Sequence, residues 1–421
     1  MTDVRLQRPR ARRLDAATRH RLARLTRWRP GLEDVPVERL LLGGQNGMTA
    51  AQFARAAGDP LWPSRRVADG PHATLLAAAR THGTLTDADI LASPYARMAR
   101  VCVRSTGRYF GAADDVGIVA QARAFLARDA GETADDAMPP EDLHSPSGQP
   151  VLVVPIADSH CYQVVDGHHR VASAAAAGRT TVSARVRRGA VTTPLQDLLL
   201  RMTWLHGGRE LYQPVPSPEL DGNWPTVRCC TDRLEAMDAF LRRVRGPRLT
   251  GSYLDVASCY GWFVAQLAAL GLEAEGIERD PLGATIGRLV YGLDPDRIRT
   301  GDAVALLRST HETWDVVSCF SLLHHFVLGR GSCDEVELVR LLDRVTGHVL
   351  FLDTGQEHER WFRSSLRGWD PSHIRSFLLE HTTFDEVLDL GPDRDAVGPY
   401  ADNYGRHLFA CVRSEPSRRD R

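Results

Sequence analysis

Three acidic residues in the second half of the chain lie at or just after predicted strands. Asp255 lies in the apolar run Tyr253–Val256, and Glu278 follows the run Glu273–Ile277, twenty-three residues after Asp255. Asp302 lies where a third strand is expected to end. Carboxylates at these positions can accept hydrogen bonds from ribose hydroxyls or from an adenine amino group. The spacing therefore favours a ligand that contains ribose and adenine.

A loop of small residues follows the first of these strands. It contains Ala257, Ser258 and Cys259, and it closes at Gly261, where a helix is expected to begin. Small side chains let a ligand approach the backbone, and a helix N-terminus offers N–H groups and the positive end of the helix dipole. Such a loop occurs in any doubly wound domain, so by itself it indicates a ligand site without identifying the ligand.

Two adjacent histidines, His324 and His325, follow the predicted strand Trp314–Cys319. Imidazole titrates near neutral pH, so either side chain could act as the base for a hydroxyl or amine substrate. We favour His325; the alternative is that one histidine packs or caps the following segment. Glu357 and His358, after a later strand, form a second candidate pair.

A second group of chemically capable residues lies in the first half, in the turn Asp166-Gly167-His168-His169-Arg170. A strand precedes this turn and a helix follows it. A cation at a helix N-terminus opposes the dipole by roughly 0.3–1 kcal/mol, so a purely structural role is poorly motivated. A bound phosphate would remove the conflict. Metal ligation is not expected, because adjacent histidine side chains diverge and no third ligand is evident.

The elements that must position these residues differ between the two halves. The first half predicts a mixed α+β arrangement, with helices near 50–57, 72–82, 115–130 and 192–205 and strands near 151–156, 162–165 and 181–186. In the second half, apolar runs alternate with helical patterns, which is typical of a buried, mostly parallel sheet. The runs are Tyr253–Val256, Glu273–Ile277, Trp314–Cys319, His348–Leu352, Phe384–Asp389 and His407–Arg413.

The composition excludes several kinds of chemistry. The 421 residues include 52 basic and 53 acidic ones, and every basic residue is arginine. Without lysine there is no Schiff-base lysine for pyridoxal phosphate, no Walker-type phosphate loop and no kinase strand lysine. The eight cysteines form no CxxC pair, which favours reduced thiols in the cytoplasm and gives no support for zinc. No membrane span and no signal peptide are expected.

Charge and turn-forming residues indicate the domain organisation. Residues 1–30 contain ten arginines and two aspartates, and an amphipathic helix with a solvated basic face is expected there. The proline-rich stretch 214–226 is expected to be a linker or an ordered strap. The predicted divisions are a basic arm at 1–35, an α+β domain at 36–213, the strap, an α/β domain at 227–415 and a tail at 416–421.

The second domain resembles a class I S-adenosylmethionine-dependent methyltransferase. The resemblance rests on Asp255–Gly261, Gly276–Asp280, Gly301–Asp302 and Asp315–Phe326. It implies a Rossmann-like, mostly parallel sheet whose final strand runs antiparallel. A nicotinamide-binding Rossmann domain is the alternative, but its third phosphate-loop glycine and its pyrophosphate pocket are not evident.

The resemblance also implies roles for single residues. The family's usual loop has glycines where Ala257 and Cys259 stand. The implied cofactor contacts are Asp255, Ala257, Ser258, Cys259 and Gly261 for the methionine part, Glu278 for the ribose, Asp302 for the adenine, and Phe320 and Ser321 on the acceptor side.

The segment Tyr162–Gly178 resembles the nucleotide-binding box of the ParB/sulfiredoxin-like superfamily, whose members bind or hydrolyse nucleotides and include a free-serine kinase. Sulfiredoxins carry their catalytic cysteine where His168 stands, so sulfiredoxin chemistry is not expected. The resemblance implies that residues 166–170 bind a nucleotide, ATP or CTP, or a phosphorylated ligand. A structural relic of such a site is the alternative.

Together these observations predict a methyltransferase that acts on an O or N atom of a small molecule or glycan, with a ParB-like domain that binds a nucleotide or phosphorylated ligand. One alternative is a bifunctional kinase–methyltransferase. The other is a nucleic-acid-associated ParB-like protein, which is disfavoured because no helix-turn-helix and no basic-aromatic surface is evident.

Overall fold

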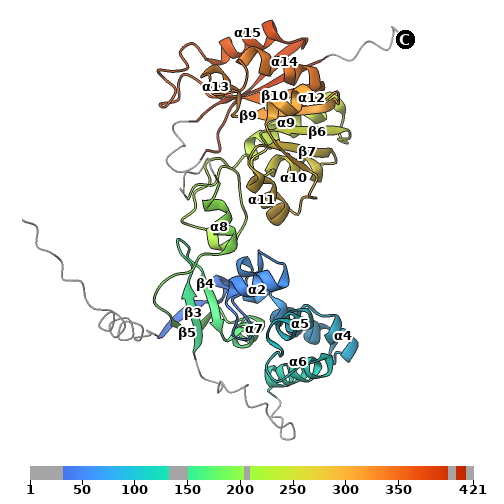
Figure 1. The fold of residues 1–421 in the computed structure, drawn as a ribbon, viewed down its shortest axis with the longest axis vertical. Coiled ribbons are helices and arrows are strands. Elements are labelled where there is room, and N and C mark those ends of the chain that lie inside the picture. The colour runs from blue at the N-terminus through green and yellow to red at the C-terminus, as the bar shows by residue number, and fades with distance from the viewer. Residues whose placement is uncertain (1–31, 132–149, 203–208, 397–403, 414–421) are drawn as a thin grey trace, which may run out of the picture. The chain divides into compact units, whose positions relative to one another are not determined.

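A computed structural model describes residues 32–131, 150–202, 209–396 and 404–413 (Figure 1). The chain divides into two compact units, Met1–Thr192 and Thr193–Arg421, and each is described by itself. The predicted amphipathic helix within residues 1–30 and the predicted tail at 416–421 lie outside the described residues.

The N-terminal unit contains a five-stranded mixed sheet. Its order is β1-β5-β3-β4-β2, in which β1 and β4 run antiparallel to β5 and β3 respectively, while β3 pairs with β5 and β2 with β4 in parallel. The strands are β1 (Leu32–Pro36), β2 (Leu40–Leu41), β3 (Val151–Pro155), β4 (Tyr162–Asp166) and β5 (Thr181–Val186).

Helices make up most of the remaining described part of this unit, and α7 packs against α3. They are α2 (Ala50–Ala57), α3 (Pro71–His82), α4 (Asp87–Ala92), α5 (Pro94–Thr106), α6 (Asp115–Asp129) and α7 (His168–Ala176). Side-chain caps fix where several of them begin: Thr49 accepts the N–H of Gln52 ahead of α2, and Asp114 accepts that of Gly117 in α6. One apolar cluster joins these helices to the sheet. The predicted α+β arrangement is therefore confirmed.

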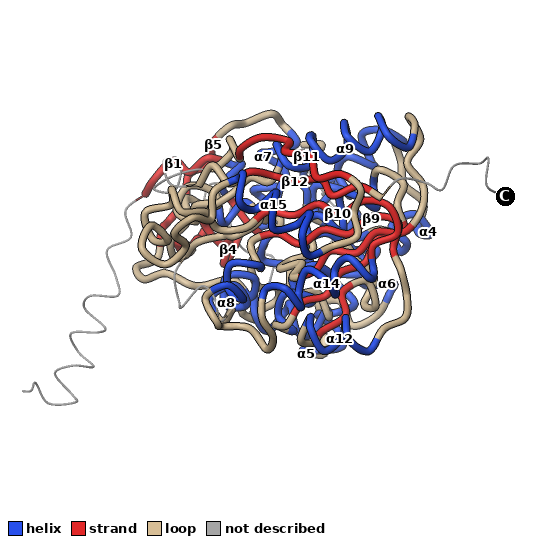
Figure 2. The backbone as a smooth tube through the Cα atoms, turned by 90° about the horizontal axis from the view of Figure 1, so that it is seen from above, coloured by secondary structure: helices blue, strands red, loops and turns tan. Residues whose placement is uncertain are grey.

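The C-terminal unit contains a seven-stranded sheet of order β11-β12-β10-β9-β6-β7-β8. The five strands from β10 to β8 are parallel, and β12 runs antiparallel to both β10 and β11. Figure 2 shows β9 and β10 side by side. The predicted Rossmann-like sheet with an antiparallel last strand is confirmed. The strands are β6 (Ser252–Val256), β7 (Glu273–Glu278), β8 (Ile298–Thr300), β9 (Trp314–Phe320), β10 (Thr346–Asp353), β11 (Glu386–Pro392) and β12 (His407–Val412).

Alternate residues of these strands face two separate apolar cores. Leu254 and Val256 of β6 pack with one set of helices, whereas Tyr253 packs with the other, as the two-residue repeat of a strand requires. The first face is covered by α12 (Ala303–Ser309), α13 (Leu323–Val327), α14 (Glu335–Val345) and α15 (Pro371–His381), and the second by α9 (Thr231–Arg245) and α10 (Trp262–Ala269), while α11 (Pro281–Tyr291) packs against α10, β7 and β8.

The structure differs from three predicted boundaries. Residues 32–35, predicted as part of a basic arm, form most of β1, which pairs with β5. The division at Thr192 precedes the predicted strap at 214–226. The helix predicted at 192–205 is α8 (Pro194–Leu200), which begins at a capping box made by Thr193 and Gln196 and lies in the C-terminal unit.

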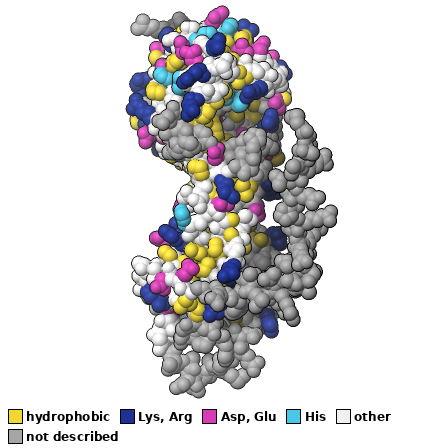
Figure 3. Space-filling view, turned by 90° about the vertical axis from the view of Figure 1, so that its left-hand side faces the viewer, with side chains coloured by type: hydrophobic (Ala, Val, Ile, Leu, Met, Phe, Trp, Pro, Cys, Tyr) yellow, Lys and Arg dark blue, Asp and Glu magenta, His cyan; other side chains and the backbone are white. Residues whose placement is uncertain are grey.

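Two surface properties bear on partners. Among the described residues, no helix is long and apolar enough to cross a membrane. On the face shown in Figure 3, arginine side chains are scattered among acidic and apolar ones and do not gather in one patch.

Candidate functional site

A cavity lies at the carboxyl ends of β6 and β9 in the C-terminal unit. Three of its lining residues, Asp255, Ala257 and Phe320, are among the predicted cofactor contacts, and Phe263 adds an apolar wall from α10. The other lining residues precede the sheet in the sequence and are not among the predicted cofactor contacts: Tyr212, Gln213, Arg228, Cys230 and Arg233.

The loop beneath the cavity has left-handed backbone geometry at three positions. Ala257, Cys259 and Gly261 have φ angles of 65°, 55° and 78°. Ala257 and Cys259 thus take the conformation that favours glycine, at a cost of about 1 kcal/mol each. A side chain at Gly261 would be strained, because the φ angle is left-handed and a Cβ there would lie 2.6 Å from Cδ1 of Ile298, which would have to move. The predicted loop therefore retains glycine-like geometry without the usual glycines.

The carboxylates of Glu278 and Asp302 both accept hydrogen bonds from the backbone. Glu278 accepts the N–H groups of Cys259 at 2.8 Å and of Asp280 at 2.9 Å. Burial raises the pKa of Glu278, although these backbone bonds act in the opposite direction. Asp302 is exposed and caps α12 by accepting the N–H of Ala305. Neither lines the cavity, and their roles toward ribose and adenine stay predictions.

Gln213 closes the N-terminus of α10. Its buried Oε1 accepts the backbone N–H groups of Tyr260 at 3.1 Å and Trp262 at 3.2 Å. In a dinucleotide-binding domain, N–H groups at this position bind a pyrophosphate. Because a side-chain oxygen already occupies them here, the geometry disfavours the nicotinamide alternative.

Two oppositely charged groups of the cavity wall have unused hydrogen-bonding atoms. Asp255 accepts a 2.6 Å hydrogen bond from Ser318 through Oδ1, but its Oδ2 has no partner among the described residues. Nε of Arg228 likewise has none within the described chain. Both side chains are about 2% exposed. Burial raises the pKa of Asp255 to about 7, against the effect of the Ser318 hydrogen bond.

The Nη2 atom of Arg228 belongs to a buried ion network. Arg228 contacts Asp353 at 2.9 Å and Asp393 at 2.8 Å, and Arg233 contacts Asp353 at 2.6 Å. Burial alone would raise the pKa of Asp353, but Arg228 and Arg233 hold it well below its usual range. The arginine positions are therefore fixed before any ligand binds. Sequence patterns gave no signal for this network, because Arg228 and Asp353 are 125 residues apart.

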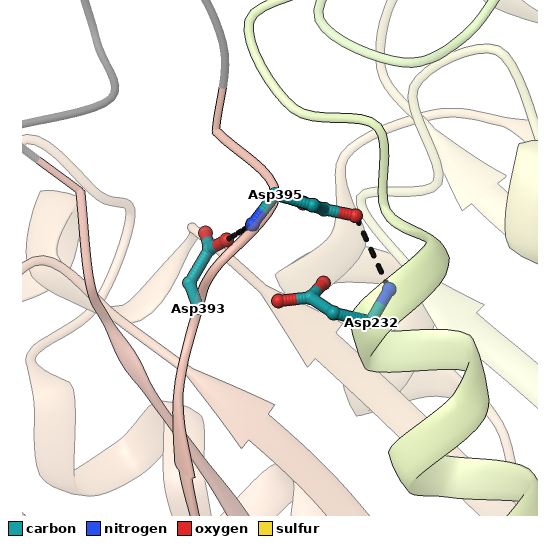
Figure 4. A group of neighbouring side chains, drawn as sticks. All are labelled: Asp232, Asp393 and Asp395. Atoms are coloured by element: carbon teal, nitrogen blue, oxygen red, sulfur yellow. Dashed lines mark hydrogen bonds between the residues drawn. The ribbon is translucent and has the colours of Figure 1, made fainter.

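Three aspartates cluster at the start of α9 (Figure 4). One carboxylate oxygen each of Asp232, Asp393 and Asp395 lies within 4.8 Å of the others. Asp393 is already paired with Arg228 and Arg233, and Asp395 accepts the Asp232 N–H at 3.2 Å. Acidic groups stabilise a helix N-terminus, so this cluster is explained as an anchor for α9.

His324 and His325 lie at the same edge of the sheet, on α13. The Nδ1 atom of His324 accepts the N–H of Gly355 at 3.2 Å, so a neutral His324 carries its proton on Nε2 and can only donate there. Burial and Arg406 lower the pKa of His324 to about 2. His325 is less buried, and burial lowers its pKa as well. Of the two predicted bases, this geometry favours His325.

The second predicted pair is engaged elsewhere. Glu357 accepts the N–H of Gly368 at 2.8 Å, and Nε2 of His358 contacts the carbonyl of Tyr404 at 2.8 Å. The neighbouring Glu359, which the sequence did not single out, is fully buried and makes a two-bond ion pair with Arg406.

In the N-terminal unit, the predicted phosphate turn leads into α7 as expected. Gly167 has a φ angle of 104° and no side chain to cap the helix. Arg170 turns back to Asp166 at 2.7 Å and to the carbonyl of Pro150. His168 points inward, and its Nε2 accepts the N–H of Gly43 at 3.0 Å. The turn brings Asp166 and Arg170 together, whereas His168 is buried and packs inside the unit.

His168 and His169 join a third histidine, His72 of α3, in an aromatic cluster. The His72 ring lies 5.7 Å from that of His168 and 4.4 Å from that of His169, and Nε2 of His169 contacts the Tyr95 hydroxyl at 3.2 Å. Burial lowers the pKa of His168 and of His169 to about 3, and lowers that of His72 well below its usual value. All three are therefore neutral at pH 7.

Comparisons with known proteins gave a match to one family model and similarity to several solved structures. The model of the ParB N-terminal domain matches residues 146–200, and no curated protein matches the chain. The bifunctional kinase–methyltransferase WbdD is 23% identical with a TM-score of 0.40, covering 52% of this chain and 46% of its own. This chain thus spans less than half of that protein.

Two other solved structures are similar to part of this chain at lower identity. Magnesium protoporphyrin IX methyltransferase (ChlM) from Synechocystis PCC 6803, with bound SAM, is 15% identical with a TM-score of 0.32, covering 44% of this chain and 79% of its own. The PH0226 protein from Pyrococcus horikoshii OT3 is 16% identical with a TM-score of 0.33, covering 48% of this chain and 95% of its own. The chain therefore contains a match to the ParB N-terminal domain at residues 146–200, which continues past Thr192 into α8.

Proposed function

We propose that the C-terminal unit is an S-adenosylmethionine-dependent methyltransferase. The observation that carries this proposal is the pair of unused, buried, oppositely charged atoms in one cavity wall, Oδ2 of Asp255 and Nε of Arg228. The methionine end of S-adenosylmethionine carries an ammonium and a carboxylate, which match these two atoms in charge and in donor–acceptor sense. Buried polar atoms are normally satisfied, so a zwitterionic ligand accounts for both.

The rest of the cofactor would follow the strand ends. We expect Glu278 to accept hydrogen bonds from ribose hydroxyls and Asp302 to approach the adenine, while Ala257, Cys259 and Gly261 would let the loop backbone come close. When bound, the cofactor supplies a methyl group activated by its sulfonium. The protein's contribution is alignment of the acceptor and removal of its proton.

For the acceptor we propose an O or N atom of a small molecule or glycan, with His325 as the base. His324 would act beside it as a hydrogen-bond donor through Nε2, because its Nδ1 is held by Gly355. An enzyme in which His325→Ala leaves turnover unchanged would exclude the base role.

For the N-terminal unit we propose binding of a nucleotide, ATP or CTP, or of a phosphorylated ligand at the start of α7. The uncapped helix end and the adjacent Arg170 support this, and the ligand's phosphate would compete with Asp166 for the guanidinium. Titration of ATP, CTP and a sugar phosphate, with Arg170→Gln as the comparison, tests it. ATP consumption that depends on Arg170 would favour a kinase–methyltransferase instead.

The methyltransferase proposal is tested by isothermal titration with one ligand that contains the amino-acid end and one that lacks it. S-adenosylmethionine contains the amino-acid end, whereas 5′-methylthioadenosine lacks it. Asp255→Asn keeps the side-chain shape. It is expected to lower the affinity for S-adenosylmethionine at least ten-fold and to change the affinity for methylthioadenosine less than two-fold. Equal weakening of both ligands would contradict the contact, and failure of S-adenosylmethionine to bind the wild-type chain would refute the proposed function.

A further inference from the structure

A continuous series of hydrogen-bonded side chains leads from the cofactor cavity to the protein surface. Arg228, in the cavity wall, donates to Oγ of Ser321 at 2.9 Å, and Arg406 donates to the same oxygen at 2.8 Å. Arg406 also holds both carboxylate oxygens of Glu359 at 2.8 Å. The second of these oxygens accepts the indole N–H of Trp361 at 2.7 Å.

Ser321 uses the whole capacity of its hydroxyl in this series. It accepts from two guanidinium groups and donates to Oδ1 of Asp353 at 3.2 Å, and a hydroxyl offers one donor and two acceptor positions. Its φ angle of 55° is also unfavourable for a residue other than glycine. The surrounding bonds therefore fix Ser321 in a strained conformation that any loss of a partner would release.

Burial makes the members of the series sensitive to one another. Arg228, Arg406 and Glu359 are at most 3% exposed, whereas Trp361 is 43% exposed. Charged hydrogen bonds interact more strongly in a low-dielectric interior than in water. A carboxylate that reaches Nε of Arg228 weakens the hydrogen bond from that arginine to Ser321. The positions of Arg406, which is bonded to Ser321, and of Glu359, which is bonded to Arg406, then change.

The end of the series lies beside the proposed acceptor site. The Trp361 ring packs against Tyr404, with ring centres 5.5 Å apart, and against Phe362 at 6.3 Å. The Phe362 ring in turn lies 4.8 Å from that of His324, next to His325. An exposed indole held at its N–H and against its neighbours is a rigid contact surface that loses little side-chain entropy when a ligand binds.

We propose that Trp361 forms part of the acceptor-binding surface, for an acceptor with a ring that can stack on indole, and that cofactor binding sets its position through Ser321, Arg406 and Glu359. This inference rests on the proposed function. Ser321, Arg406 and Glu359 are positioning residues here, because they act on the acceptor through Trp361. The consequence is ordered binding, in which the cofactor precedes the acceptor.

The test is fluorine NMR of the full chain labelled with 5-fluorotryptophan. The Trp361 signal is identified as the one that disappears in Trp361→Phe. S-adenosylhomocysteine is expected to shift this signal in the wild-type chain. The shift should be lost in Glu359→Gln and in Ser321→Gly, which keeps the left-handed backbone accessible, and should be partly kept in Arg406→Lys.

Calorimetry with the same ligand separates this inference from the proposed function. Glu359→Gln should bind S-adenosylhomocysteine within two-fold of wild type. Arg413→Gln, which breaks an ion pair with Asp343 of α14, should leave both the affinity and the Trp361 shift unchanged. An unmoved Trp361 signal in a chain that binds the ligand would overturn the coupling alone. No binding at all would overturn the proposed function and this inference with it.

The acceptor part has its own probes, phenol and methyl α-D-glucopyranoside. At least one of them should shift the Trp361 signal when S-adenosylhomocysteine is bound and not in its absence. A shift of equal size without the cofactor product would contradict ordered binding. No shift with either ring compound would exclude Trp361 as a ring-stacking surface.

Discussion

The affinity for S-adenosylmethionine should fall as the pH is lowered from 7 to 6. Burial raises the pKa of Asp255 to about 7, and its Oδ2 has no partner in the described chain. An ammonium at this oxygen favours the ionised carboxylate, so binding releases a proton. Without ligand about half of the Asp255 carboxylates are ionised at pH 7 and about one in eleven at pH 6, which predicts an affinity loss of about five-fold, or ~1 kcal/mol.

Isothermal titration in two buffers of different ionisation enthalpy measures both quantities. At pH 7 the binding of S-adenosylmethionine should release about half a proton from Asp255. The α-amino group of the cofactor has an ordinary pKa near 8 and stays largely protonated between pH 6 and pH 7. It therefore contributes little to the measured proton release. Methylthioadenosine and the Asp255→Asn variant should both show affinities independent of pH. A wild-type dissociation constant for S-adenosylmethionine that stays constant between pH 6 and 7 would refute the reasoning.

Three further predictions concern stability. His72, His168 and His169 are neutral in the fold and have pKa values near 6.5 when unfolded, so acid favours the unfolded N-terminal unit. Its free energy of unfolding should fall by up to about 4 kcal/mol per pH unit below 6.5. Equal amide-exchange protection of α3 and α7 at pH 7 and 5.5 would contradict this. Ala257→Gly and Cys259→Gly should each raise the free energy of unfolding by up to about 1 kcal/mol, measured by urea denaturation, because they relieve left-handed strain; Gly261→Ala should lower it. Asp353→Asn should lower the free energy of unfolding by about 3 to 5 kcal/mol, because it leaves two buried arginines short of a partner. Asp389→Asn, at the half-exposed pair with His407, should lower it by less than about 1 kcal/mol. Similar losses for both variants would show that the buried network does not cause the effect.

The sequence predicted most strands of the C-terminal unit, because local apolar periodicity determines them. The apolar runs that became β6, β7, β9 and β12 were predicted within about one or two residues, and β10 and β11 began two residues away from the predicted starts. The small-residue loop was also predicted, and Ala257 and Cys259 have the left-handed geometry that favours glycine. Its role in binding a ligand stays a prediction.

The features that periodicity does not determine were missed. β1 pairs with β5, whose residues lie roughly 150 positions later, and its Leu32 is exposed, so no apolar alternation marked it. The cap that Gln213 places on α10 joins positions 47 and 49 residues apart. The ion network around Asp353 depends equally on tertiary contact. Half of the cavity wall is therefore made by residues whose role only the folded chain reveals.

The most direct test of the central claim is a crystal structure of the full chain with S-adenosylhomocysteine. The account predicts the ligand's ammonium within hydrogen-bond distance of Oδ2 of Asp255 and its carboxylate on Nε of Arg228. It would be contradicted by a ligand whose amino-acid end points away from both atoms, or by a cavity that remains closed to the ligand at saturating concentration.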